Sequence, residues 1–387
     1  MLNVLEAQDI AELGERLRVA RANAGLTQGD AAERLRLART TLLAVEKGQR
    51  RVRPDELRDM ASLYDISINA LLRPTSVHVD LAPRFRSLSG AGDGPAAEAA
   101  RLLNDLVAAE VEIERLVGQP LRANYPPERP ILSGDIREQA EEVASELRHR
   151  FGLGLAPIKD VVRLLELDLG IRVFIRPLRS GSISGLYAFD DELGACILLN
   201  RHHSPRRRAL TAAHELGHLV ATRREPDVVD LAHDPTSREE RYAKSFALAF
   251  MMPAAAMRRW FHDTVRATGR FSPRHLVFLA QEYSVSEEAM CRRLEELQLL
   301  PGGTWESLSE RKFSAEEIRR SLGDQPSGLE VIVSPRLWLL AGEAYRCELL
   351  SEGQLARMLR IDRVEVRAML DALDAEGAHD LRSVSAI

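Results

Sequence analysis

The sequence predicts a multidomain protein with an all-α N-terminal domain, an α+β middle domain and a helical C-terminal region. Short capped helices follow one another over residues 13–72, three β-rich runs stand among helices over residues 135–223, and the patterns after residue 311 are helical. With 387 residues, 45% of them hydrophobic, the chain can bury more than one core. We expect four segments, with the bounds 1–75, 76–132, 133–310 and 311–387.

Signals for export or membrane insertion are missing from the sequence. The start, MLNVLEAQDIAELGERL, mixes acidic with apolar residues and lacks the basic region and apolar run of a signal peptide. No run of about 18 apolar residues exists to form a transmembrane helix. Cys196, Cys291 and Cys347 are scattered, which excludes a CxxC metal cage and fits a reducing compartment. We therefore expect a cytoplasmic protein without a membrane partner.

The charge of the chain reverses locally near the N-terminus. The net charge is −5, but residues 34–53 hold seven basic side chains against one acidic one. A basic patch on an acidic protein indicates a nucleic-acid-binding surface, because the patch attracts phosphate locally.

The basic patch lies in a run of short helices. Thr27 is the expected N-cap of a second helix, with Asp30 in the capping position, and Gly48 closes a third helix. A turn near residues 37–38 separates these two helices, and Pro54 begins a fourth. This pattern predicts a helix-turn-helix, which lays its second helix in the DNA major groove. A helical protein-interaction module is the alternative.

The stretch GLTQGDAAERLRLARTTLLAVEKGQRRV resembles the Xre/Cro family of phage-repressor DNA-binding domains. The resemblance implies a lambda-repressor-like fold and double-stranded operator DNA as the partner. It places four residues at DNA-reading positions, namely Gln28, Arg39, Thr40 and Ala44. Three arginines, Arg50, Arg51 and Arg53, are expected to hold backbone phosphates, which adds affinity without sequence choice. Because Xre-type domains usually address two half-sites, we expect a homodimer.

A linker and one long helix follow. Residues 73–95 are punctuated by Pro, Gly and Ser and predict a linker. Residues 96–116 predict an amphipathic helix, whose apolar stripe indicates a docking or dimer surface. A membrane-surface role is disfavoured because the polar face is acidic, where anionic lipid requires basic side chains.

The middle domain combines helices with strands. Helical patterns cover residues 135–151 and 157–169, β-rich runs cover 170–177, 184–190 and 195–200, and a further helix covers 208–223. This order predicts a small α+β domain.

The helix RALTAAHELGHLVATR carries the pattern HExxH. His214 and His218 stand four residues apart and face the same side of a helix, where both imidazoles can reach one metal ion. Catalytic zinc takes three protein ligands and leaves one position open. Glu215 lies beside that position, where a carboxylate can take the proton from a water molecule that attacks a peptide carbonyl. Gly217 leaves room for a neighbouring element. Two surface histidines without a metal are the alternative.

A third ligand is expected from the helix SREERYAKSFALAFMMP. Its apolar stripe must pack on the core, and packing against the HExxH helix points Glu239 or Glu240 toward the histidines. Helical spacing does not choose between these two, because each shares the stripe with different apolar residues.

TAAHELGH followed by EERYAKSFALAFMMP is similar to the ImmA/IrrE group of zinc metallopeptidases, and the likeness covers residues 133–310. The resemblance implies a zincin-like, gluzincin-type domain with Zn²⁺ held by His214, His218 and Glu240, and Glu215 as the catalytic residue. Lys244 stands where the family usually has Asn. An oxyanion donor is also expected, and the sequence does not rank the four candidates, His202, His203, His233 and Tyr242.

The C-terminal region contains helical patterns at 314–322, 335–350, 351–361 and 363–373. The stretch LLSEGQLARMLRIDRVEVRAMLDAL imitates a helix-turn-helix, with Ser351 as N-cap and residues 360–362 as the turn. Because its basic and acidic residues balance, we expect a packing or dimer element. A second DNA reader and a ligand-sensing cap are the alternatives.

The two resemblances together imply a DNA-binding transcriptional regulator with a zinc-dependent endopeptidase domain that cleaves a repressor and so controls stress or mobile-element genes. The substrate is a separate repressor protein or this chain itself, for example at FRSLSGAGDGP, residues 85–95. One alternative is a non-catalytic DNA-binding repressor or antitoxin-like regulator that uses the zinc domain as a sensor or protein-binding module. Another is a protease whose helix-turn-helix binds only protein.

Overall fold

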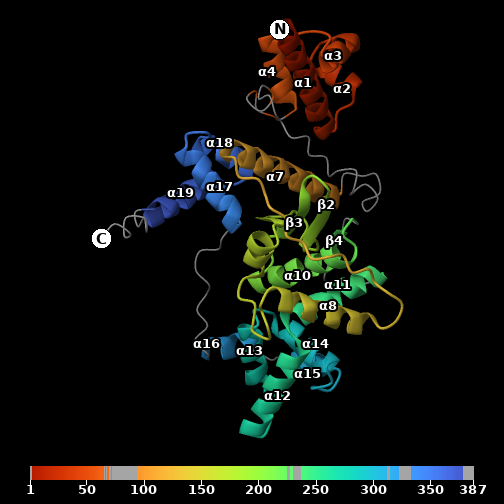
Figure 1. Cartoon of the computed structure of the whole chain (residues 1–387), viewed down its shortest axis with the longest axis vertical. Coiled ribbons are helices and arrows are strands. Elements are labelled where there is room, and N and C mark those ends of the chain that lie inside the picture. Colours follow the sequence, from red (N-terminus) through yellow and green to blue (C-terminus); the bar gives the residue numbers. More distant parts are fainter. Residues whose placement is uncertain are drawn as a thin grey trace. The chain divides into compact units, whose positions relative to one another are not determined.

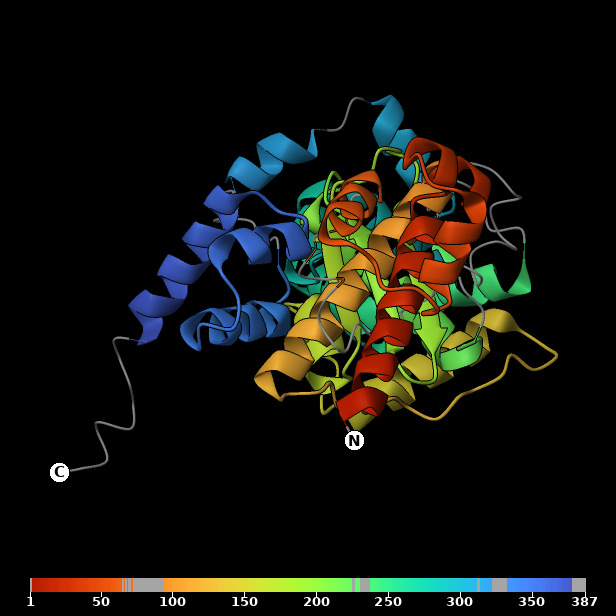
Figure 2. The same ribbon diagram turned by 90° about the horizontal axis from the view of Figure 1, so that it is seen from above.

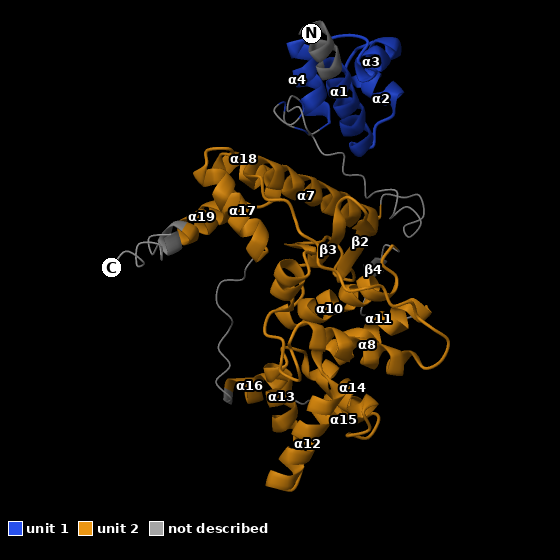
Figure 3. Cartoon of the chain, in the orientation of Figure 1, with its two compact units in different colours: residues 1–78 blue, residues 79–387 orange. Residues whose placement is uncertain are grey.

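The computed structural model describes residues 2–64, 66, 68, 71, 94–224, 227–229, 237–311, 314–321 and 333–377 (Figure 1). The chain divides into two compact units, unit 1 with residues 1–78 and unit 2 with residues 79–387 (Figure 3). In the described residues unit 1 is helical, and unit 2 combines helices with one sheet, so the predicted multidomain fold class is confirmed. None of the helices in these ranges is long and apolar enough to cross a membrane.

Unit 1 contains the short helices that the sequence predicts. Thr27 accepts a hydrogen bond from the Asp30 backbone N–H, and the Asp30 carboxylate accepts one from the Thr27 N–H, so a capping box begins the second helix. Gly48 follows the C-cap of the third helix with a φ of 65°. The helices are α1 (Leu2–Asn23), α2 (Gln28–Arg34), α3 (Arg39–Glu46) and α4 (Pro54–Leu63).

The core of unit 1 fixes these helices against one another. Leu17 of α1, Ala31 of α2, Leu42 of α3 and Met60 of α4 are all fully buried in one apolar cluster. Because burial of such side chains contributes about 1.5–3 kcal/mol for each large one, the cluster holds α2 and α3 in a defined geometry.

Unit 2 is built on a four-stranded sheet with the order β1-β3-β2-β4. Strand β1 runs parallel to β3, whereas β2 is antiparallel to both of its neighbours. The three β-rich runs form β1 (Arg172–Arg176), β2 (Gly185–Asp190) and β3 (Gly194–Asn200), as predicted. The edge strand β4 (Asp227–Val229) was not predicted from the sequence.

Three helices pack in succession below this sheet. Helix α10 contacts β2 and β3, and α11 contacts both α10 and α8 (Figure 1). Each begins at a short polar side chain, Asp135 for α8, Ser204 for α10 and Ser237 for α11, which accepts hydrogen bonds from the first-turn backbone. The helices are α8 (Ile136–Arg150), α10 (Pro205–Ala221) and α11 (Arg238–Met251).

Further helices complete this part of unit 2. The helical pattern predicted over residues 157–169 forms a short α-helix that continues as one turn of π-helix. These elements are α9 (Val161–Arg163), η1 (Leu164–Asp168), α12 (Ala254–Thr268), α13 (Pro273–Glu282), α14 (Glu287–Glu296), α15 (Thr304–Glu310) and α16 (Ala315–Ser321).

The long helix α7 (Pro95–Val117) lies between the sheet and the C-terminal helices α17 (Pro335–Arg346), α18 (Glu352–Leu359) and α19 (Arg363–Gly377). It contacts β1 and β3 as well as α17 and α18. Figure 2 shows the C-terminal helices in blue beside α7 in orange. The apolar residues Leu103, Leu106, Val107 and Ile113 of α7 are fully buried. The stripe expected to form a docking or dimer surface is therefore covered within unit 2.

A buried cluster of charges joins α7 to β1 and α17. Arg172 contacts Glu110 at 2.8 Å and Glu114 at 2.6 Å, and Arg336 of α17 contacts each of these carboxylates at 2.7 Å. Glu166 of η1 accepts the backbone N–H of Arg336 at 2.7 Å, and burial raises the pKa of Glu166 to about 7. Because loss of one partner would leave an unpaired buried charge, the cluster favours a single position of α17 on α7.

Candidate functional site

Helix α10 carries both histidines of the HExxH pattern into the interior of unit 2. His214 and His218 are 1% and 4% exposed, and their Nε2 atoms lie 3.2 Å apart. The four-residue spacing places the rings one turn apart on the same face of the helix. Neither histidine is therefore a surface residue.

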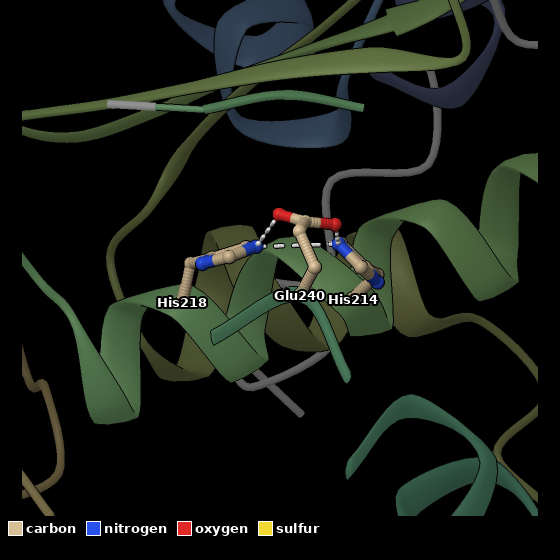
Figure 4. Close-up of side chains that lie close together, drawn as sticks. All are labelled: His214, His218 and Glu240. Carbon is tan, nitrogen blue, oxygen red and sulfur yellow. Dashed lines mark hydrogen bonds and ion pairs between the residues drawn. The ribbon is translucent and has the colours of Figure 1, made fainter. Parts of the chain in front are cut away.

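Helix α11 supplies a carboxylate to the two rings. Glu240 Oε2 lies 3.3 Å from His214 Nε2, and Glu240 Oε1 lies 3.0 Å from His218 Nε2 (Figure 4). Within the described ranges, these three side chains form the cluster of His, Cys, Asp or Glu that is close enough to share a metal ion. Glu239 is not part of this cluster, so the structure brings Glu240, of the two glutamates, to the histidines.

Close packing of α10 on α11 allows this contact. A Cβ atom on Gly217 would lie 3.0 Å from Ala243 Cα and 3.2 Å from Phe246 Cδ1. Side chains larger than hydrogen would force the two helices apart, since the first of these atoms belongs to the backbone. Gly217 therefore has the role that the sequence predicts, which is to admit a neighbouring element between the two histidines.

The ligand atoms fit a tetrahedral zinc ion. Zinc bonds of about 2.0–2.1 Å at tetrahedral angles place neighbouring ligand atoms about 3.3 Å apart. The three measured separations are 3.0, 3.2 and 3.3 Å. Two imidazoles and one carboxylate would fill three corners, which leaves the fourth corner for water or substrate.

The electrostatics of the cluster favour the forms that bind metal. Burial lowers the pKa of His214, which favours a neutral imidazole. Burial alone would raise the pKa of Glu240, but hydrogen bonds from the two histidines outweigh it and hold that pKa well below its ordinary value. Neutral imidazole and ionised carboxylate are the ligand forms of these side chains.

Glu215 is fully buried next to His214, with its carboxylate against the sheet. A Cβ atom on Gly185 of β2 would lie 2.9 Å from Glu215 Oε1 and 2.8 Å from Thr211 Cγ2. Glycine at this strand position therefore makes room for the carboxylate. A glycine within a strand often marks such a close approach, so the sequence does contain a signal for this contact.

Two further side chains contact His218. The ring of Tyr187 stacks on the imidazole at a centroid distance of 6.5 Å, and its hydroxyl donates to the Arg223 carbonyl at 2.8 Å. Thr222 Oγ1 lies 3.1 Å from His218 Nδ1. Such contacts fix the orientation of a ligand histidine. The sequence pattern missed Tyr187 and Thr222 because only the tertiary fold brings them to the ring.

The candidate oxyanion donors are in different surroundings. Tyr242 is buried and stacks on Phe246, His203 Nε2 lies 2.9 Å from the Gly181 carbonyl, and His202 is exposed. The fourth candidate, His233, lies outside the described residues. Neither His202 nor His203 belongs to the group of described side chains that could hold a metal ion, which consists of His214, His218 and Glu240.

The predicted DNA-reading residues lie on α2 and α3 of unit 1. Arg39 and Thr40 are exposed, and Ala44, one turn further along α3, is half-buried. Gln28 at the start of α2 donates a hydrogen bond of 2.9 Å to the buried carboxylate of Glu46. In helix-turn-helix domains that bind DNA, the N-terminal residues of the second helix of the motif contact the base edges.

The predicted phosphate-binding arginines differ in their surroundings. Arg50 contacts Glu56 at 2.8 Å, so a phosphate would have to replace this carboxylate. Arg51 and Arg53 are exposed. The side chains of Arg50 and Glu56 are 31% and 12% exposed, so Arg50 is already engaged in a partly buried pair within unit 1.

Comparisons with known proteins match both regions. A helix-turn-helix domain family matches residues 12–73, and the IrrE N-terminal-like domain of the peptidase M78 family matches residues 167–295. The solved structure of Bacillus thuringiensis PlcR in complex with the peptide PapR7 and DNA covers 95% of this chain and 97% of its own, at 12% identity and a TM-score of 0.17. A TM-score this low supports no structural argument. No curated protein sequence matches the chain.

The matched ranges agree with the positions of the two candidate sites. Residues 12–73 contain the basic patch and the capped helices α2 and α3, and residues 167–295 contain His214, Glu215, His218 and Glu240. The chain is therefore a fusion of an N-terminal helix-turn-helix domain with an IrrE N-terminal-like domain of the peptidase M78 family.

Proposed function

We propose that this chain is a cytoplasmic DNA-binding transcriptional regulator whose second domain is a zinc-dependent endopeptidase. The observation that carries the enzymatic part is the triangle of His214, His218 and Glu240, in which the ligand atoms are 3.0–3.3 Å apart. Surface side chains do not reach such an arrangement by chance, since two helices must approach at Gly217 to form it.

Each residue of the site has one task in this proposal. His214, His218 and Glu240 would hold one zinc ion, which supplies a Lewis acid for the scissile carbonyl and lowers the pKa of the attacking water. The Glu215 carboxylate takes a proton from this water and returns it to the leaving amine. Its burial against Gly185 keeps it in position for both transfers. The side chain of Glu240 is 29% exposed, so solvent reaches the cluster from the side of α11.

Unit 1 would select the DNA sequence to which the protein binds. Gln28, Arg39, Thr40 and Ala44 would read base edges, and Arg50, Arg51 and Arg53 would hold phosphates of double-stranded operator DNA. Glu46 restricts the rotation of Gln28, which prepares this side chain for one hydrogen-bonding direction. A homodimer would place two such domains on two half-sites.

The substrate that fits a DNA-bound peptidase is a repressor protein at the same operator, or the segment of this chain over residues 85–95. Cleavage of the repressor or of this segment would change transcription, while the affinity of unit 1 for DNA would stay the same. Release of stress or mobile-element genes is the biological outcome that we propose.

One substitution tests the enzymatic part. Glu215→Gln keeps the size of the side chain and leaves the three ligands intact, so the variant should keep about one zinc ion per chain and its DNA binding. Cells producing the wild type should contain new protein N-termini that are missing with Glu215→Gln. The matched control is Glu239→Gln, which changes a glutamate outside the cluster and should behave as wild type.

The same three strains distinguish the peptidase from the non-catalytic alternative. Identical N-termini in all three strains, with zinc retained, would mean that the zinc domain acts without turnover. The protein would then be a DNA-binding repressor or antitoxin-like regulator that uses the cluster as a sensor or as a protein-binding module.

A further inference from the structure

The C-terminal helices α18 and α19 repeat the geometry of α2 and α3. A capping box begins α18 at Ser351, as one begins α2 at Thr27. The left-handed turn residue is Arg360 with a φ of 52°, and its counterpart is Arg36 with a φ of 54°. In both cases the turn residue stands nine positions after the N-cap, and the second helix starts three positions later.

Hydrogen bonds and buried positions follow the same register. The N–H of Ile361 bonds the Ala356 carbonyl at 3.1 Å, as the N–H of Leu37 bonds the Ala32 carbonyl at 2.9 Å. The buried apolar side chains also correspond, with Leu355, Ala356 and Val366 in one motif matching Ala31, Ala32 and Leu42 in the other. The stretch that imitates a helix-turn-helix in sequence is therefore a helix-turn-helix in structure.

The face of α19 that corresponds to the reading face of α3 is open to solvent. Arg363 stands where α3 has Arg39, Val364 where it has Thr40, and Ala368 where it has Ala44. Val364 is 80% exposed, and the side chains of Arg363 and Arg367 are 69% and 67% exposed. We call Arg363, Val364, Arg367 and Ala368 the α19 face.

Unit 2 holds the opposite side of this motif. Arg360 pairs with Asp105 of α7 at 2.9 Å, and Glu365 pairs with Arg201 at 3.2 Å. The buried guanidinium of Arg176 donates to the Leu359 carbonyl at the end of α18 at 2.6 Å. These contacts fix the motif on unit 2 and leave the α19 face directed away from it.

We propose that the α19 face is a second surface for double-stranded DNA, separate from the helix-turn-helix of unit 1. Arg363 and Arg367 are suited to guanine edges or phosphates, and Val364 and Ala368 are suited to thymine methyl groups. Val364 lies between the two arginines at the start of α19 and is 80% exposed, so packing on the described part of unit 2 does not account for a valine here. One chain would thus contact DNA at two places.

The repeated helix-turn-helix geometry, rather than the net charge, favours DNA over a protein partner. Asp105 neutralises Arg360 and Arg201 neutralises Glu365, so the charges that remain at the start of α19 are Arg363 and Arg367 beside the carboxylates of Glu352 and the exposed Asp362. Glu352 is only 18% exposed and contacts Arg367 at 3.0 Å. A carboxylate behind an arginine orients the guanidinium without covering its outer edge.

The test uses the full chain with the first reader disabled. Arg39→Glu with Thr40→Glu should remove DNA reading by unit 1, and the variant is then selected against a pool of random-sequence DNA duplexes. We expect this variant still to enrich a sequence motif. Adding Arg363→Gln and Arg367→Gln should weaken binding to the enriched duplex about tenfold or more and reduce the salt dependence by about two phosphate contacts.

A second variant and a control keep the result clear. Val364→Asp alters a side chain that is 80% exposed, so it should fold normally and yet lose the motif. Arg266→Glu on α12, whose side chain is 82% exposed, changes net charge elsewhere and should not affect the motif. Failure to enrich a motif, or an affinity unaffected by the α19 substitutions, would overturn the proposal. If the α19 face bound a protein instead of DNA, the α19 substitutions would leave the affinity for DNA unchanged. Because unit 1 is disabled throughout, the outcome is independent of its own DNA binding.

Discussion

Gly217 of α10 faces Ala243 of α11 so closely that a Cβ atom on the glycine would lie 3.0 Å from the Ala243 Cα. This contact sets the distance between the helix that carries the histidines and the helix that carries Glu240. The geometry of the cluster therefore depends on a residue that is not a ligand.

Gly217→Val should destabilise unit 2 and weaken metal binding together. The added methyl groups would overlap α11 and cost about 1–3 kcal/mol or more, because neither helix backbone can move without disturbing the core. Thermal unfolding followed by circular dichroism, with zinc content measured on the same samples, checks this. The control is Gly353→Ala in α18, where an added Cβ meets atoms no nearer than 3.7 Å and should not lower stability. Equal Tm values for the two variants would contradict the role given to Gly217.

Removal of the third ligand should abolish zinc binding, whereas removal of its neighbour should not. His214→Ala and Glu240→Ala each leave two protein ligands, which is too few to hold zinc tightly. Elemental analysis of the purified full chain should find about one zinc per wild-type chain, almost none in these variants, and the wild-type value in Glu239→Ala. Zinc retained by Glu240→Ala and lost by Glu239→Ala would reverse the assignment.

Glu46→Ala should destabilise unit 1 and weaken its DNA binding. Glu46 is buried and accepts hydrogen bonds from Arg21 at 2.6 Å and Gln28 at 2.9 Å, so its removal strands a largely buried guanidinium. We expect a loss of about 1–3 kcal/mol in the free energy of unfolding of unit 1, since Arg21 keeps its hydrogen bond to the Leu26 carbonyl. Chemical denaturation and fluorescence anisotropy with a selected DNA duplex measure the two effects. Glu33→Ala, on the exposed side of α2, serves as the control.

Stability of unit 2 should decrease as the pH rises through the range in which Glu166 titrates. Burial raises its pKa from an ordinary value of 4.5 to about 7, so the folded chain binds this proton more tightly than the unfolded chain. Below about pH 4.5 protonated Glu166 contributes its full stabilisation to the folded chain, and this stabilisation is lost as the pH rises toward about 7. Between about pH 4.5 and pH 7 the loss should be about 3 kcal/mol.

Glu166→Gln isolates this contribution. The amide can still accept the backbone N–H of Arg336 but does not titrate, so the unfolding free energy of the variant should depend less on pH by that amount. Urea denaturation at several pH values measures the difference. Glu316→Gln, an exposed change on α16, controls for the loss of one carboxyl group. Parallel pH profiles for wild type and Glu166→Gln would count against a raised pKa.

Elements with local signals were predicted well from the sequence. The capping boxes at Thr27 and Ser351 start helices where they were expected, because a cap depends on residues three positions apart. The strands β1 to β3 also appear where β-rich runs end at Gly, Asp or Asn. The two histidines are close to each other for the same reason, since one helical turn fixes their spacing.

Features that depend on tertiary contacts could not be predicted from the sequence. The sequence shows that α7 has an apolar stripe but does not show what covers it, and the cover comes from the sheet and from helices near the end of the chain. Glu239 and Glu240 differ only by which of them the packing of α11 turns toward α10. Tyr187 and Gly185 reach the site through the order of strands in the sheet, which no local pattern encodes.

The contacts of Arg336 have a consequence for how the chain is made. Its carboxylate partners Glu110 and Glu114 precede it by 226 and 222 residues, so a ribosome releases α7 long before α17 exists to cover it. His214, His218 and Glu240 all emerge in between. During translation α7 must therefore wait with part of its apolar stripe uncovered and with Glu110 and Glu114 paired to Arg172 but not to Arg336, a state on which chaperones and proteases can act. A message truncated before the codon for Arg336 would produce a chain that holds the cluster residues but cannot close unit 2.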